Sequence, residues 1–154
     1  MKRAVVLVLT NDQGQVLLLE RTKDDKHFPS EYCLPGGKVD WIKEKIEFTT
    51  EHINSVVDYI PRQETDDEAC IRECIEETGI IPSLIQDTGI TAVGSDAKFI
   101  VKIFKGLRAV DASEVTKEFP NREHNSFGFY DLEHLPKLIG SLTHKIVKQV
   151  LNIK

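Results

Sequence analysis

Three glutamates lie close together in the middle of the chain, in a segment that is typical of a helix. Glu73 and Glu76 are three residues apart, and Glu73 and Glu77 are four apart. On a helix, these carboxylates project from nearly one face. Like charges at such spacings repel each other, so the cluster needs a counter-ion, protonation or solvent. Mg²⁺ prefers carboxylate oxygens and also binds substrate phosphates, so a metal site is one interpretation; a solvated acidic face is the other.

Residues upstream favour the metal interpretation. Residues 34–37 read Leu-Pro-Gly-Gly. Because proline fixes one backbone torsion and glycine permits unusual ones, we expect an irregular loop there. Glu64 precedes Arg72 by eight residues, and an arginine inside an acidic cluster can order carboxylates through bidentate hydrogen bonds.

The helix that carries the glutamates has recognisable ends. Thr65 and Glu68 form a capping-box pattern, in which the hydroxyl and the carboxylate each satisfy an otherwise unpaired backbone N–H. Gly79 stands where a left-handed residue commonly follows the last helical turn. We therefore expect a helix over residues 65–78, with one side packed on a sheet through Ala69, Cys70, Ile71, Cys74 and Ile75.

A second helix is expected upstream, over residues 42–60. Pro61 would end it. Spacings of three, four and seven between apolar residues favour an amphipathic helix over a strand. These residues are Ile42, Ile46, Ile53, Val56, Val57 and Ile60.

The rest of the chain predicts a layered domain. Residues 3–10 and 16–19 are rich in apolar and β-branched residues and flank a turn signal, so we expect them to form a hairpin. The resulting order of elements predicts an α/β (α+β) fold, with a mixed β-sheet between helices and an extra inserted amphipathic helix. Further expected elements are strands over 99–107 and 126–130, a helical turn over 132–135 and a helix over 142–153.

Composition limits the classes of protein to consider. The 154 residues have the length of one domain, expected over residues 1–154. No apolar run is long enough to span a bilayer, so no membrane association is expected. The net charge of −5 does not favour binding to a nucleic-acid polymer. Three cysteines, an odd number without a Cys-x-x-Cys pattern, favour a cytoplasmic location.

The helix and the loop together resemble the Nudix family. Residues 64–80 place Glu, Arg-Glu, Glu-Glu and Gly at the spacings of the Nudix box, G-x5-E-x7-R-E-U-x-E-E-x-G-U. Residues 32–40 are similar to the family's loop, in which an aromatic residue precedes L-P-G-G-K-V-E. Residues 122–136 resemble the family's late acidic residue, strand and D-L-x-x-L-P ending. The resemblance spans most of the chain.

Two features depart from the family pattern. Residues 38–63, which are 26 in number, separate Gly37 from Glu64, where the family has five. We interpret this as an insertion of about 21 residues at about residues 41–62. The family's apolar position after Arg-Glu holds Cys74, which is a tolerable small hydrophobic residue.

The resemblance implies a hydrolase of nucleoside diphosphates linked to another moiety, with Mg²⁺ as cofactor and Mn²⁺ as a substitute. Metal ions neutralise the charge of a diphosphate and orient an attacking water. By resemblance, the metal-binding carboxylates are Glu73, Glu76 and Glu77, with the main-chain carbonyl of Gly36 or Gly37 as an additional ligand and Glu64 as a further candidate.

The catalytic roles are less determined by the resemblance. Arg72 would orient either Glu64 or Glu73. One carboxylate must act as general base toward water, and Glu76 or Glu73 is favoured, with Glu123 as a rival. A metal-bound carboxylate is a poorer base, so the two assignments compete.

Three residues are candidates for binding a small nucleotide substrate. Lys38 could contact a phosphate as a point charge, and Arg21 and Phe127 could line a nucleotide pocket. Each has a plainer alternative, which is an exposed loop residue for Lys38 and a surface or core position for the others. Family motifs for ADP-ribose, dinucleoside polyphosphates and coenzyme A are not found, which leaves nucleoside triphosphates and nucleotide sugars.

Alternatives stay open for the insertion and for the function. The inserted helix could cover the site, form a homodimer through its Ile and Val face, or pack on its own domain. The alternative function is a non-catalytic Nudix-fold nucleotide sensor or regulator. Such proteins commonly lose glutamates of the box, whereas this chain keeps Glu64, Glu73, Glu76 and Glu77.

Overall fold

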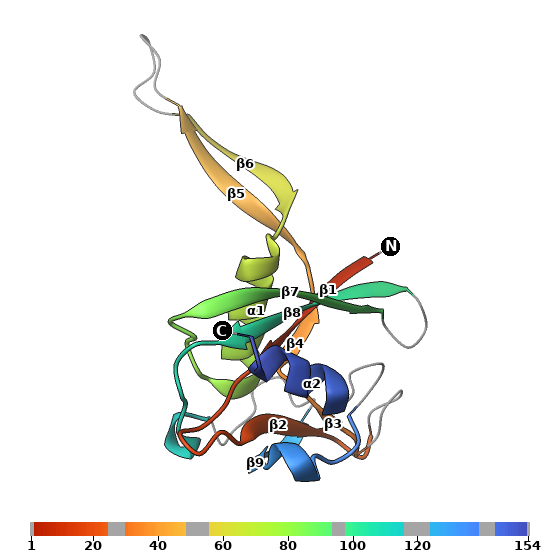
Figure 1. The fold of residues 1–154 in the computed structure, drawn as a ribbon. Helices are drawn as coiled ribbons and strands as arrows, with labels where there is room; N and C mark the ends of the chain where they lie inside the picture. Colours follow the sequence, from red (N-terminus) through yellow and green to blue (C-terminus); the bar gives the residue numbers. More distant parts are fainter. Residues whose placement is uncertain are drawn as a thin grey trace.

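A computed structural model describes residues 2–24, 30–48, 56–93, 98–115, 124–138 and 144–153. Within them the chain forms nine strands, two α-helices and two short 3₁₀ helices (Figure 1). Their order is β1 (Lys2–Val8), β2 (Val16–Arg21), β3 (Tyr32–Cys33), β4 (Gly36–Lys38), β5 (Trp41–Phe48), β6 (Val56–Gln63), α1 (Asp66–Thr78), β7 (Ile85–Val93), β8 (Phe99–Gly106), η1 (Ala112–Glu114), β9 (His124–Tyr130), η2 (Leu132–His134) and α2 (His144–Leu151).

The larger sheet has the strand order β4-β1-β8-β7 and is mixed. Strand β1 pairs in parallel with β8 and antiparallel with β4, while β7 pairs antiparallel with β8. Successive side chains of a strand point to opposite faces. Accordingly, Val5 and Leu7 of β1 join one buried cluster, and Val8 joins another.

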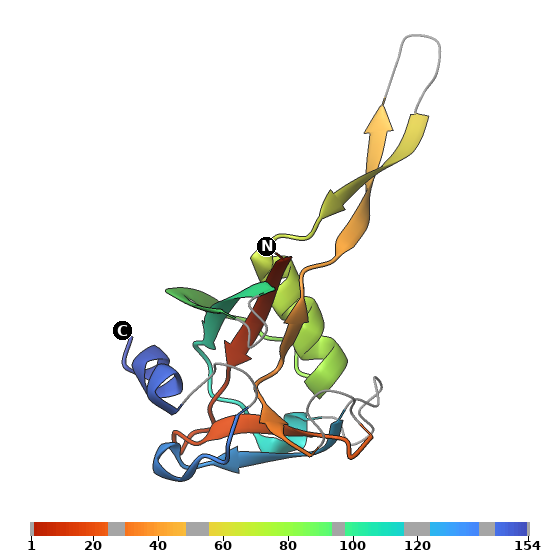
Figure 2. The same cartoon turned by 90° about the vertical axis from the view of Figure 1, so that its right-hand side faces the viewer.

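Each face of this sheet is covered by a helix. Helix α1 packs on the face of Val5 and Leu7 through small buried residues, among them Ala69 and Cys70. Helix α2 packs on the opposite face with Val147 and Val150 fully buried. Figure 2 shows the two helices on either side of the sheet. The predicted mixed sheet between helices is therefore confirmed.

The predicted hairpin of the first two strands is wrong. Strand β2 belongs to a second sheet, with the order β3-β2-β9. Between β1 and β2 the chain turns at Asn11, whose side chain accepts hydrogen bonds from the backbone N–H groups of Gln13 and Gln15. Residues 16–19 are all fully buried. A strand that is apolar on both faces must be covered on both sides. In β2, Leu17 belongs to the buried cluster under α1, while Val16 and Leu18 belong to the cluster under α2.

The predicted helix over residues 42–60 is also wrong. Residues 42–48 and 56–60 instead belong to the antiparallel strands β5 and β6, paired from Trp41 opposite Gln63 to Phe48 opposite Val56. Residues 49–55, which include Ile53 of the predicted helix, lie outside the described residues. Five apolar residues of the predicted helix, at positions 42, 46, 48, 56 and 60, are even-numbered and so fit an alternating pattern too, whereas Ile53 and Val57 do not. Enrichment in β-branched and aromatic residues decides for strands. Figures 1 and 2 show that the ribbon extends away from the rest of the chain.

The Pro-Gly-Gly segment is more regular than expected. Gly36 and Gly37 open strand β4, which pairs with Val6 and Val5 of β1. Neither glycine has a positive φ. The glycines therefore serve close approach between chain segments, and not an unusual torsion.

Other predicted elements are confirmed. The capping box of α1 is present, with Thr65 accepting from the backbone N–H of Glu68, and Gly79 ends the helix in the left-handed conformation. Strands β8 and β9, the turn η2 and helix α2 also lie where they were expected. In the part of the chain that the structure describes, no helix is long and apolar enough to cross a membrane.

Candidate active site

Helix α1 lies against β4, which brings residues 36–38 next to residues 72–77 (Figure 2). Two glycines make this approach possible. A Cβ atom at position 36 would collide with the carbonyl oxygen of Val5, and one at position 37 would collide with the carboxylate of Glu73. Gly36 therefore lets β4 pair with β1, and Gly37 leaves room for an acidic side chain of α1.

Arg72 connects the polar groups of this region. Its Nε and Nη2 donate to the two carboxylate oxygens of Glu64 over 2.8 and 2.9 Å. Its Nη1 donates to Glu73 over 3.0 Å and to Glu76 over 3.1 Å. Nη2 also donates to the main-chain carbonyl of Lys38, over 3.0 Å. One guanidinium thus holds three carboxylates and the end of β4, and it contacts both Glu64 and Glu73, between which its role was left open.

Glu64 is a buried carboxylate with a full set of partners. It is 4% exposed, and beside Arg72 it accepts a hydrogen bond from the backbone N–H of Asp40 over 2.9 Å. The hydrogen bonds from Arg72 lower the pKa of Glu64, and Glu64 in turn raises the pKa of Arg72. A buried ion pair is stable only when its other polar atoms are also satisfied, and Asp40 supplies that bond.

The three carboxylates of α1 differ in exposure. The side chains of Glu77, Glu73 and Glu76 are 3%, 16% and 51% exposed. Glu77 accepts a hydrogen bond from the backbone N–H of Gly36 over 2.6 Å. The exposure of the three carboxylates thus increases from Glu77, which lies against β4, to Glu76, which is open to solvent.

Behind Glu77 lies a buried polar contact with the second sheet. His124 Nε2 lies 3.4 Å from Glu77 Oε2 and 3.4 Å from Cys33 Sγ. Cys33 and His124 belong to the strands β3 and β9, which flank β2. This contact joins α1 to the smaller sheet.

Sequence comparison decides which family has this arrangement. The family model of the NUDIX domain matches residues 1–150. The chain belongs to the Nudix family. It is therefore a Nudix hydrolase, as its box predicted, and the family supports pyrophosphohydrolase activity in general.

Solved structures share the fold of this Nudix chain. A MutT protein from Methanosarcina mazei Go1 is 22% identical, with a TM-score of 0.67 over 97% of this chain and 91% of that one. A MutT NUDIX hydrolase from Burkholderia pseudomallei is 22% identical, with a TM-score of 0.68 over 97% of each chain. The NUDIX domain of Shewanella oneidensis NrtR, complexed with ADP ribose, is 18% identical, with a TM-score of 0.64 over 98% of this chain and 86% of that one. A search of the curated proteins finds no match.

Nudix hydrolases generally use divalent metal ions. Among the described residues, no three acidic, histidine or cysteine side chains converge as in a formed metal site. The donors nevertheless fit a hard cation, which takes carboxylate and carbonyl oxygens. Glu73 and Glu76 both bind the same nitrogen, Nη1 of Arg72, so their oxygens are close neighbours. Glu76, with its side chain 51% exposed, is the carboxylate of α1 most accessible from solvent.

The candidate substrate residues lie in different places. Lys38 ends β4 beside Arg72, and its ammonium lies 5.4 Å from the centre of the Phe99 ring. Arg21 pairs in register with His124, one strand away from the Glu77 contact. Phe127 packs partly buried against two core clusters, which fits its plainer interpretation as a core residue. The carboxylate helix thus has Lys38 at its edge.

One predicted catalytic residue cannot be placed. Glu123 lies outside the described residues, so its role as a rival base stays a prediction.

Sequence reasoning overlooked three residues of the region. Asp40 acts mainly through its backbone N–H, which no side-chain pattern signals. His124 contacts a carboxylate of the box, and its place beside Glu123 was the available signal. Cys33 contacts His124 across the smaller sheet, and no local pattern signals a contact between segments so far apart in the sequence.

The two helix cysteines are confirmed as packing residues. Cys70 and Cys74 are buried in the cluster beneath α1. Burial raises the pKa of Cys70 to about 12 and that of Cys74 to about 11. Both thiols are therefore protonated at neutral pH and are poor ligands for a soft metal.

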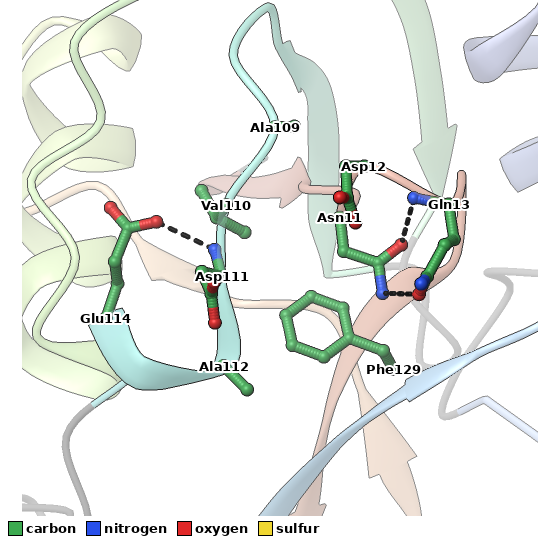
Figure 3. Close-up of a pocket in the computed structure, with 9 residues that line it drawn as sticks. All are labelled: Asn11, Asp12, Gln13, Ala109, Val110, Asp111, Ala112, Glu114 and Phe129. Carbon is green, nitrogen blue, oxygen red and sulfur yellow. Dashed lines mark hydrogen bonds between the residues drawn. The ribbon is translucent and has the colours of Figure 1, made fainter.

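A separate pocket lies where the β1–β2 turn meets η1 (Figure 3). Its volume is about 520 Å³. Its acidic residues include Asp111 and Glu114, and none of its nine lining residues is lysine or arginine. Glu114 is already engaged by Arg108 over 2.8 Å and by the backbone N–H of Asp111 over 2.7 Å. Its charge does not favour a diphosphate, so the carboxylate helix remains the candidate active site.

Proposed function

We propose that this Nudix hydrolase uses Mg²⁺, with Mn²⁺ as a substitute, to cleave a phosphoanhydride bond in a nucleoside diphosphate linked to another moiety. Nucleoside triphosphates and nucleotide sugars are the first candidates for the substrate. The observation that carries the proposal is the Arg72 network, in which one guanidinium holds Glu64, Glu73 and Glu76 together. A cytoplasmic location stays a prediction from the cysteine content.

In this proposal Glu73 and Glu77 would hold the ion, with the main-chain carbonyl of Gly36 or Gly37. Glu76, which the resemblance implies as a further ligand, is assigned instead to the base, because a metal-bound carboxylate is a poorer base. When bound there, a divalent ion would neutralise charge on the diphosphate and make water a better nucleophile. We assign Glu64 a positioning role instead of the ligand role considered above, because Arg72 binds both of its oxygens and the N–H of Asp40 binds one of them as well.

Arg72 and Lys38 have separate tasks. Arg72 fixes the side chains of Glu73 and Glu76 against β4, which limits the orientations that a substrate phosphate meets. Lys38, at the end of β4, contacts a phosphate oxygen as a point charge. The main-chain carbonyl of Lys38 accepts a hydrogen bond from Arg72, which keeps the backbone of Lys38 next to the guanidinium.

We favour Glu76 as the general base toward water. A general base must reach the proton that it removes, and the Glu76 side chain is 51% exposed, against 16% for Glu73. Glu73 remains the second candidate and Glu123 the third.

The test compares wild type with Glu76→Gln on nucleoside triphosphates, nucleotide sugars and dinucleoside polyphosphates, with Mg²⁺ or Mn²⁺. Wild type should release phosphate or nucleotide product only with the ion present. Removing a general base costs about 10²- to 10⁴-fold in rate, so kcat of Glu76→Gln should fall by that factor.

Asp67→Asn is the matched control, because Asp67 is an exposed carboxylate on the same helix. It should keep the wild-type rate. Equal turnover by wild type and Glu76→Gln would reject the role of Glu76. If wild type turns over none of the substrates yet binds a nucleotide in calorimetry, the enzyme proposal fails and the sensor alternative takes its place.

A further inference from the structure

The ribbon formed by β5 and β6, residues 41–48 and 56–63, is called the arm. No side chain described in the arm is buried, and Trp41, Tyr59 and Ile60 are 69%, 58% and 45% exposed. Among the described residues, β5 and β6 pair only with each other. A two-stranded ribbon is marginally stable alone in water. Within the described part of the chain, the arm therefore lacks the cover that the other two sheets have.

The two edges of the arm differ in their capacity to accept another strand. Proline has no N–H, and an edge strand accommodates it where its nitrogen faces away from the partner strand. Pro61 of β6 stands opposite Lys43 of β5. The outer edge of β6 therefore lacks a donor at Pro61, which is one way in which proteins block edge pairing. Strand β5 contains no proline over residues 41–48, so its outer edge is open.

Strand β5 is also complementary to itself. In an antiparallel pair, the backbone N–H and C=O groups of two opposite residues point either both toward the other strand or both away from it. When two copies of one strand pair, even-numbered residues therefore stand opposite even-numbered ones, and odd opposite odd. A register centred on Lys45 overlaps residues 42–48 of two copies. It places Lys43 opposite Glu47 twice and Ile42 opposite Phe48 twice. Only Lys45 meets a like charge, its own copy on the symmetry axis. A register centred on Glu44 would instead place Lys43 opposite Lys45.

We propose that the arm is a dimerisation element, in which β5 pairs antiparallel with β5 of a second copy of this chain. The two ribbons then form one four-stranded sheet. Such a contact is isologous, since each copy contributes the same residues. The arm extends away from the rest of the chain (Figures 1 and 2). Antiparallel pairing of two arms would therefore leave the remaining parts of the two copies at opposite ends of the shared sheet. The inference does not depend on the proposed catalytic activity.

The test is sedimentation equilibrium of wild type, Lys43→Glu, Glu47→Lys and a mixture of the two variants. Wild type should form a dimer. Each single variant places like charges in both copies of the 43–47 pair, and like charges directly opposite are destabilising, so its dimer should weaken by about tenfold or more. When the two variants are mixed, glutamate meets lysine in both pairs, and a heterodimer should form.

The mixture also controls for folding of the arm. Lys43 stands opposite Pro61 and Glu47 opposite Val57 within one copy, so neither position lies directly opposite a charged residue of its own ribbon. A damaged arm would not regain association on mixing. A wild-type protein that stays monomeric at high concentration overturns the proposal, even if the arm captures a different protein. A dimer that is indifferent to both variants overturns it as well.

Discussion

The carboxylate helix and the arm are neighbours in sequence, and an arginine–glutamate pair anchors each of them. The two pairs differ in how far they are buried. At the helix, Arg72 binds Glu64 with two bonds while Glu64 is 4% exposed. At the base of the arm, Arg62 of β6 binds Glu68 of α1 over 2.8 and 3.0 Å, again through two bonds. The second pair is open to solvent, with side chains 34% and 38% exposed. Similar bonds therefore stand in different dielectric surroundings.

The difference in burial between the two pairs corresponds to different roles. The carboxylate site must keep a fixed geometry, whereas the arm is proposed to bind a second copy of the chain. Charged pairs in water contribute little to stability, because side-chain entropy and solvent screening offset their attraction. Removing one member of a buried pair leaves an uncompensated charge. We therefore expect the helix network to belong to the stable body of the enzyme, and the arm to open independently of it.

The largest effect that separates the two regions should come from removing each arginine. Arg72→Met leaves Glu64 buried without its partner, which should lower the free energy of unfolding by about 3 kcal/mol. It should also release Glu73 and Glu76 from β4 and reduce kcat/KM. Chemical denaturation and steady-state kinetics measure the two effects.

Arg62→Met is the matched variant, because Arg62 likewise makes two bonds to one glutamate, here the partly exposed Glu68. Its free energy of unfolding and its kcat/KM should stay close to wild type. If the two variants lose similar stability, burial does not distinguish the networks, and the comparison fails.

The sequence predicted the helix network better than the arm for a physical reason. The positions of Arg72 and the glutamates are fixed by helical spacing and by the capping box, which are local properties of residues 64–79. For residues 42–60, several of the apolar positions fit a helical and an alternating pattern alike. The arm also has no buried face among its described side chains, so no core requirement signalled its secondary structure.

Contacts between distant segments escaped prediction for another reason. The approach of His124 to Glu77 depends on how the second sheet meets α1, which no local pattern contains. The same holds for β2, which was assigned to a hairpin although its four fully buried residues required cover on both faces. Local spacing thus predicted the carboxylates, while the packing of sheets decided what surrounds them.

A smaller effect should distinguish the two glycines that let α1 and β4 approach. In Gly37→Ala, the new Cβ meets the end of the flexible Glu73 side chain, which can move aside at little cost in stability. Misplacing a catalytic group by about 1 Å can cost about 10²-fold in rate, so kcat/KM should fall by up to that factor. In Gly36→Ala, the Cβ meets the backbone of Val5, and overpacking there should cost about 1–3 kcal/mol of unfolding free energy.

Kinetics and denaturation of both variants test this contrast. Gly37→Ala should lose activity with near wild-type stability, and Gly36→Ala should lose stability first. A Gly37→Ala enzyme with full activity would show that the position of Glu73 against β4 is not needed for catalysis.

The smallest and most selective effect is in the pH and salt dependence of Glu64→Gln and Glu68→Gln. The hydrogen bonds from Arg72 lower the pKa of Glu64, and those from Arg62 lower the pKa of Glu68 to about 2. A carboxyl with a lowered pKa binds fewer protons in the folded than in the unfolded state just below its ordinary pKa, so stability falls as the pH falls. Each contribution is complete at neutral pH and is lost toward the lowered folded pKa.

Salt separates the two carboxylates. Exposed charges are screened by salt, whereas buried pairs are screened much less. The stability difference between wild type and Glu64→Gln should therefore shrink on acidification but persist in high salt at neutral pH. The difference for Glu68→Gln should be small and should vanish in salt, and glutamine keeps the capping box there. Equal salt sensitivity of the two differences would mean that the Glu64–Arg72 pair behaves as a surface pair, and the site would then owe its rigidity to packing instead of charge.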